Sequence, residues 1–369
     1  MGGKINRQLL VAGFVWLLAF LNGAPSAICE GRIGAIEELE EFAERGTPQA
    51  RTGMSLAPIL AYEPTFGGVF GGAAFLERPF DPRYRLFTRG AFSSRGEYSV
   101  LFSLKRWYRE DTFYDLEVEV DDFARPYYGE GMDTVASDRI MLEGTVPRVL
   151  FYFHSRRVLA AAFGPFLDFR GVHPEGVDGT EIPPPDFDES SLALGYFLAY
   201  DNRNSQLSPS DGRYSTAKVH LVPDSFSTYG QSRTFLQAEM DHRIFRPLGE
   251  GLVLAARFYV GGSWGTPSYQ FRYSVGGPYF LRGFFTNRFR GDKVYAAQGE
   301  LRKHLFWIGS AAVFAEIGEA TDDWFRSPKA SVGAGLRFTL PPDHVAKARL
   351  DFAWAEDQRS VYFIFGEAF

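Results

Sequence analysis

The chain has 369 residues, a formal net charge of −6 and an aromatic content of 16%, with 36 Phe, 18 Tyr and 6 Trp. An acidic chain without a run of basic residues argues against a nucleic-acid partner. The mean hydropathy of −0.16 leaves both a soluble protein and a membrane β-barrel open, because barrel strands are individually only weakly hydrophobic.

The first residues have the layout of a secretory signal peptide. Lys4 and Arg7 precede an apolar run over residues 9–21, and small residues follow up to Ala27. The run is shorter than the about 20 residues that a membrane-spanning helix needs. We therefore expect residues 1–29 to be a signal peptide that is cleaved near Ala27 or Cys29. Cys29 is the only cysteine, so the chain forms no intramolecular disulfide.

Residues 30–53 form a short zone of their own. Ile33, Ile36, Leu39 and Phe42 recur near helical spacing among glutamates, and Gly46 follows. This pattern predicts a short amphipathic N-terminal segment. It would lie at the mouth of a barrel or inside one, and a mobile tail is the alternative.

From residue 54 to residue 369 apolar and polar residues alternate with period two, which predicts an all-β chain. A soluble sandwich alternates in the same way. Strand length, aromatic content and the signal peptide favour a transmembrane antiparallel β-barrel of about 16 strands, whose even count puts both ends on the periplasmic side. The predicted spans are 54–63, 66–77, 83–93, 97–107, 111–121, 139–154, 157–170, 189–200, 212–222, 232–243, 251–263, 293–306, 309–319, 329–340, 346–355 and 360–369. The longest connections are 122–138, 171–188 and 264–292.

The last predicted strand ends on an aromatic residue. Val361, Phe363, Phe365 and Phe369 share one parity, so on a strand they face one side. A closed barrel supplies the neighbour strand that such an edge needs, whereas the final core strand of a soluble β protein is the alternative. In secreted bacterial chains this ending resembles the signal that outer-membrane assembly machinery reads. The resemblance implies that Phe363, Phe365 and Phe369 form the assembly signal.

Charged residues in the third long connection, and in the two predicted strands after it, suit one ion-paired group. Parity places Glu300 and Glu316 on the inner face of adjacent strands, where two carboxylates repel unless a cation lies between them. Arg282 offers a planar fork with a permanent charge. Gly283 beside it allows a sharp turn close to the barrel wall. The alternative is an ordinary loop arginine above a wet lumen.

These segments resemble motifs of the BamA/TamA superfamily of outer-membrane assembly and translocation barrels, the bacterial surface antigen family. Residues 276–284, GGPYFLRGF, are similar to its VRGF/Y motif, which sits in a long loop after the eleventh strand and folds into the lumen. Residues 298–302 resemble the acidic motif of its twelfth strand, and residues 314–318 its F-x-D-x-G motif, with Glu316 in place of aspartate. The resemblance covers 54–369 and implies a lumen loop lock made of Arg282, Gly283, Phe284, Glu300 and Glu316.

The resemblance also implies a function in the outer membrane after signal cleavage. It implies insertion or translocation of proteins, or of lipids, through a weak seam between the first and last strands. The expected partners are outer-membrane lipid, client outer-membrane proteins and a periplasmic protein that supplies POTRA-like domains, since residues 30–53 are too few for such a domain. A passive pore and a surface-exposed structural or antigenic barrel are the alternatives. Histidines are scattered and no catalytic or metal-ligand spacing occurs, so we expect no enzyme activity, metal or cofactor.

Overall fold

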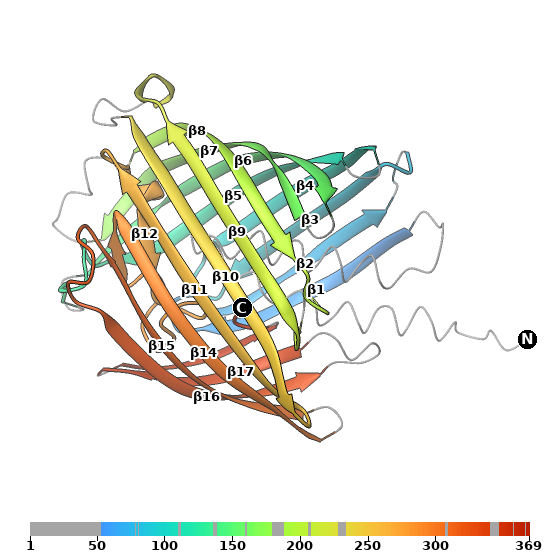
Figure 1. Cartoon of the computed structure of the whole chain (residues 1–369). Helices are drawn as coiled ribbons and strands as arrows, with labels where there is room; N and C mark the ends of the chain where they lie inside the picture. The colour runs from blue at the N-terminus through green and yellow to red at the C-terminus, as the bar shows by residue number, and fades with distance from the viewer. Residues whose placement is uncertain are drawn as a thin grey trace, which may run out of the picture.

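The computed structural model is all-β and forms a closed antiparallel barrel of sixteen strands, which confirms the predicted fold class (Figure 1). It describes residues 53–369 except 78, 80, 110–111, 136–138, 159–160, 179–187, 206–207, 228–233, 307–308, 340–346, 357 and 366. The predicted signal peptide and residues 30–52 lie outside the described residues. No helix within the described ranges is long and apolar enough to cross a membrane.

Neighbouring strands of the barrel follow chain order, and the barrel closes where the first strand meets the last. The barrel strands are β1 (Gly53–Glu63), β2 (Gly67–Glu77), β3 (Tyr84–Ser93), β4 (Tyr98–Arg109), β5 (Thr112–Tyr127), β6 (Ile140–Val158), β7 (Ala161–Asp178), β8 (Glu189–Asp201), β9 (Gly212–Val222), β10 (Phe235–Gly249), β11 (Leu252–Trp264), β14 (Lys293–Phe306), β15 (Gly309–Thr321), β16 (Lys329–Thr339), β17 (Lys347–Ala355) and β18 (Gln358–Phe365).

The two faces of the strands show why period two leads to a barrel rather than a sandwich. On β5, the inward Asp115 and Glu119 are buried, while the outward Val118 is 38% exposed. The buried carboxylates pair with cations of other strands: Nη2 of Arg89 on β3 lies 2.9 Å from Glu119. A charged interior with an apolar exterior is the inverse of a soluble protein and matches a barrel that faces lipid.

Several strand ends depart from the prediction, and β10, for example, runs to Gly249 instead of residue 243. β5 runs on to Tyr127, because the β5–β6 ladder continues as far as the pair Tyr127↔Ile140. β7 runs on to Asp178, which pairs with Met141 of β6, and β6 itself ends at Val158. Residues 122–127 of the predicted loop 122–138 therefore belong to strand β5. At the other end of the chain, β18 ends at Phe365 instead of continuing to residue 369.

The long connection between β11 and β14 carries structure of its own. It contains the short helix η3 (Tyr269–Phe271) and the strands β12 (Tyr273–Val275) and β13 (Phe289–Gly291), which pair with each other. Most of its residues are buried although no barrel strand lies among them. This connection, residues 265–292, fills part of the lumen, and we call it the lumen loop.

Candidate functional site

Arg282 lies at the turn of the lumen loop and its side chain is fully buried. Its Nε donates to Oε1 of Glu316 on β15 across 2.6 Å, and its Nη1 donates to Oδ2 of Asp351 on β17 across 2.9 Å. Its Nη2 lies 3.1 Å from Oε2 of Glu300 on β14, as an ion pair. The ring centre of Phe314 lies 3.4 Å from the guanidinium carbon. The structure thus brings Arg282, Glu300 and Glu316 together.

The sequence analysis missed Asp351 and the arginines around it. Arg337 of β16 bonds Asp351 across 2.5 Å and Glu300 across 2.9 Å. Arg302 pairs with Glu300 across 2.9 Å, and Nε of Arg349 lies 3.5 Å from Asp351. The alternation of charged and apolar residues along β16 and β17 is the signal that could have placed these side chains in the lumen. The candidate lock is a shared ion network rather than one triad.

Glycines let the loop reach this network. Gly283 has φ of 112°, a region that L side chains rarely adopt. A Cβ at Gly283 would lie 2.8 Å from the Cβ of Ala355 on β17. Gly276 has φ of 113°, and a Cβ there would lie 2.3 Å from the carbonyl oxygen of Phe285. At both positions the backbone conformation and the close approach exclude a larger residue.

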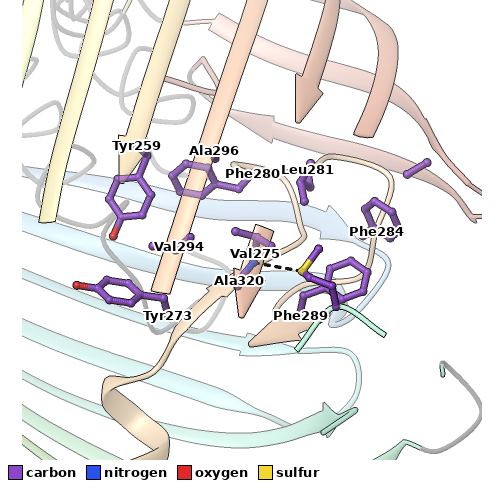
Figure 2. Close-up of a cluster of buried hydrophobic side chains, with 12 residues drawn as sticks. Tyr259, Tyr273, Val275, Phe280, Leu281, Phe284, Phe289, Val294, Ala296 and Ala320 are labelled. Carbon is purple, nitrogen blue, oxygen red and sulfur yellow. Dashed lines mark hydrogen bonds between the residues drawn. The ribbon is translucent and has the colours of Figure 1, made fainter. Parts of the chain in front are cut away.

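An apolar cluster holds the rest of the loop in place. Figure 2 shows Phe280, Leu281 and Phe284 of the loop beside Val294 and Ala296 of the β14 wall. The predicted lock residue Phe284 is 1% exposed. Its ring meets that of Phe289 edge to face, with centroids 5.0 Å apart. The loop is therefore packed against the wall and not only tethered by charge.

The connection between β5 and β6 contributes to this cluster and contacts β13 and β15. Met132 is 3% exposed and belongs to the same cluster, and its sulfur accepts a hydrogen bond from the backbone N–H of Ala320. Gly131 forms a β-bridge with Arg290 of β13. The loop thus lies against both the barrel wall and residues 131–132 of this connection, which we call the cap.

The structure separates the three residues of the predicted assembly signal. Phe363 lies on β18 opposite Tyr62, and β18 ends at Phe365. Phe369 does not lie on that strand, so the expectation that the last strand continues to Phe369 was wrong, whereas the assembly signal stays a prediction. It is 4% exposed and packs beside Phe245 of β10, with ring centroids 6.4 Å apart. The chain end marked C in Figure 1 accordingly lies within the outline of the barrel.

Ion pairs give the physical reason for this turn into the lumen. Oε2 of Glu367 accepts a hydrogen bond from Nε of Arg337 across 2.9 Å, and Nζ of Lys347 lies 3.3 Å from Oε1. Arg302 donates to the main-chain oxygen of Phe369 across 3.2 Å. Burial raises the pKa of Glu367, but Arg302, Lys347 and Arg337 outweigh burial and lower this pKa to about 2. We call residues 367–369 the lumen tail.

Within the described ranges, no group of three or more His, Cys, Asp or Glu side chains could hold a metal ion. The site's donors are mostly arginines, each already paired with carboxylates or main-chain oxygens. Their chemistry suits the holding of backbone and carboxylate groups.

The sequence and the fold match known proteins at different levels. A family model described as the Omp85 superfamily domain matches residues 177–369, which is more than half of the chain. No curated protein matches the chain.

Solved structures match over most of the chain at low identity. BamA from Haemophilus ducreyi lacking POTRA domains 1-3 gives a TM-score of 0.63 at 13% identity, covering 90% of this chain and 78% of that one. CdiB from Escherichia coli gives 0.63 at 14%, covering 91% and 71%. CdiB from Acinetobacter baumannii gives 0.60 at 12%, covering 99% and 72%. At such identities the likeness concerns the fold alone.

Proposed function

The chain belongs to the Omp85 superfamily, and from this premise we propose that it assists the insertion or translocation of proteins, or of lipids, at the outer membrane. Its strands would span that membrane after removal of the signal peptide. Client outer-membrane proteins and the surrounding lipid are the partners that this function implies. A periplasmic partner with POTRA-like domains belongs to the same proposal, and copurification with the tagged barrel tests it.

The observation that carries the proposal is the seam between β1 and β18. Among the described residues, these strands face each other at one pair, Tyr62↔Phe363. By contrast, the β17–β18 ladder runs without interruption from Ala348↔Phe365 to Ala355↔Gln358. Unpaired backbone groups are costly in lipid, so this seam is where a strand of another chain would gain most by adding to the sheet.

The β1–β2 hairpin beside the seam is also easier to bend than the rest of the wall. β2 places four glycines opposite β1, in the pairs Pro58↔Gly72, Ile59↔Gly71, Tyr62↔Gly68 and Glu63↔Gly67. Glycine contributes no side chain to pack across the strands. Bending at this hairpin therefore disrupts fewer side-chain contacts than bending elsewhere in the wall.

A reversible crosslink tests the role of the seam. Facing residues of an antiparallel pair have Cα atoms about 4.5–5.5 Å apart, which suits a disulfide. Cysteines at Tyr62 and Phe363 should crosslink on oxidation and stop client insertion by the reconstituted barrel, and reductant should restore it. A matched pair at Trp354 and Arg359, which face each other within the β17–β18 ladder, should leave insertion unchanged. Equal insertion by the oxidised and reduced seam variants would contradict the proposal.

The alternative function is a passive pore for small solutes. The packed lumen loop and its cap argue against a wide open channel. Planar-bilayer recordings of the purified barrel should accordingly show little steady conductance. A large steady conductance, together with normal outer-membrane proteins in a deletion strain, would replace assembly by the pore.

A further inference from the structure

The lumen loop is bound to the last strand just beyond Arg282. The backbone N–H of Gly283 donates to the phenol oxygen of Tyr362 across 3.2 Å. The same hydroxyl donates to the carbonyl oxygen of Phe284 across 3.0 Å. The hydroxyl of Ser360 donates to the carbonyl oxygen of Gly283 across 2.8 Å. Tyr362 is 1% exposed, so three buried hydrogen bonds join the loop to the inner face of β18.

The same stretch of loop also reaches the turn that follows the first strand. The backbone N–H of Thr286 donates to Oγ1 of Thr65 across 3.2 Å. Thr65 lies in the turn between β1 and β2 and is 6% exposed. Arg95, in the turn between β3 and β4, fixes the β1–β2 turn, since it donates to the carbonyl oxygens of Thr65 and Pro64. Residues 283–286 are therefore tied to β18 on one side of the seam and to the turn after β1 on the other.

These contacts matter because so few backbone pairs join β1 to β18. One facing pair joins β1 to β18 in the described part of the chain, whereas the loop bonds β18 and the turn after β1 from within. Arg282, the residue before this stretch, is held by Glu316 and Asp351 on strands that do not border the seam. The stretch is thus anchored on the rigid wall at one end.

We propose that residues 283–286 form a strap that holds the seam closed from inside, and that Tyr362 is its positioning residue. The inference rests on the proposed role of the seam. To open, β18 must release Gly283, which takes the β18 partners away from the N–H and the carbonyl oxygen of that residue in a poorly solvated lumen. Client insertion therefore requires the lumen loop to move, and Tyr362 couples the loop to the gate.

Distance measurements across the seam test the strap without relying on client insertion. Phe70 of β2 and Trp354 of β17 are exposed on the outer face and flank the seam, so spin labels at cysteines there report its width by electron paramagnetic resonance. Purified barrel in nanodiscs is compared as wild type, Tyr362→Phe, Ser360→Ala and Thr65→Val. The matched control is Tyr295→Phe, which removes a hydroxyl bonded to Glu319 across 2.9 Å away from the seam.

Tyr362→Phe should raise the population with a wide seam about 25-fold, because two hydrogen bonds are lost. Ser360→Ala and Thr65→Val should raise it about fivefold from either side, whereas Tyr295→Phe leaves it unchanged. An unchanged distance distribution in both Tyr362→Phe and Thr65→Val overturns the strap, as does an equal widening in the control. If the seam widens while client insertion stays at the wild-type rate, the strap stands and the proposed function fails.

Discussion

Glu316 binds Arg282 twice. Its Oε1 accepts from Nε across 2.6 Å, and its Oε2 accepts from the backbone N–H across 2.7 Å. One carboxylate therefore fixes both the side chain and the loop backbone. The longer arm of glutamate, in place of the aspartate of the related motif, is compatible with this double contact.

Replacing Arg282 by alanine should lower the free energy of unfolding of the refolded barrel. The change leaves Glu316 without its cation, while Glu300 and Asp351 keep Arg337. Losing one partner of a buried ion pair costs about 3–5 kcal/mol on the general scale. Arg282→Lys should recover only part of this, since an ammonium has no planar fork. Urea titration in detergent measures both.

A double-mutant cycle provides the control for this prediction. Arg282→Ala and Glu316→Ala should couple, because each removes the other's partner. Strict additivity, or an Arg282→Ala barrel as stable as wild type, would show that Arg282 does not lock the lumen.

Gly283→Ala should destabilise the lumen loop. The position has φ of 112° and its added Cβ would lie 2.8 Å from the Cβ of Ala355, so we expect a loss of more than about 1 kcal/mol. Gly299→Ala on β14 is the matched control, because no atom lies within 4 Å of its added Cβ. Equal unfolding midpoints for the two variants would count against a close approach at Gly283.

Deleting Phe369 should reduce the amount of barrel in the outer membrane, as expected for an assembly signal. The deletion also removes a buried ring that packs beside Phe245, which costs about 3–5 kcal/mol on the scale for a lost buried Phe. Refolding in detergent separates the two effects, because it needs no assembly machinery. Val361→Ala, at a residue 40% exposed on the outer face, should change neither measurement much. Normal membrane levels of the deletion variant would refute the role of Phe369 in the assembly signal.

The lumen tail should loosen in acid. Cations lower the pKa of Glu367 from 4.5 to about 2, so its contribution is fully present above about pH 5. It is lost as the pH falls towards 2, and the shift corresponds to about 3 kcal/mol. Glu367→Gln should therefore cost stability at pH 7 and progressively less below pH 5. A difference between the two proteins that is independent of pH would argue against these ion pairs.

The sequence alone determined the strands and their faces. Period two is a local property, because each residue's side of a strand follows from its neighbours in the chain. For that reason sixteen strands could be predicted, and the spans 212–222 and 293–306 match β9 and β14 residue for residue. The same alternation put Glu300 and Glu316 on the inner face, and the glycines around Arg282 marked a loop that turns sharply.

Only the tertiary structure decided which inward side chains meet. Asp351 is 69 residues from Arg282, and their contact depends on how the barrel closes and how far the lumen loop enters it. The lumen tail shows the same limit. Parity put Phe369 on the same face of a continuing strand as Val361 and Phe363, but Arg302, Arg337 and Lys347 draw Glu367 inward. Attraction between groups that are distant in sequence outweighed the local pattern there, because a cluster of buried cations needs carboxylates wherever the chain can supply them.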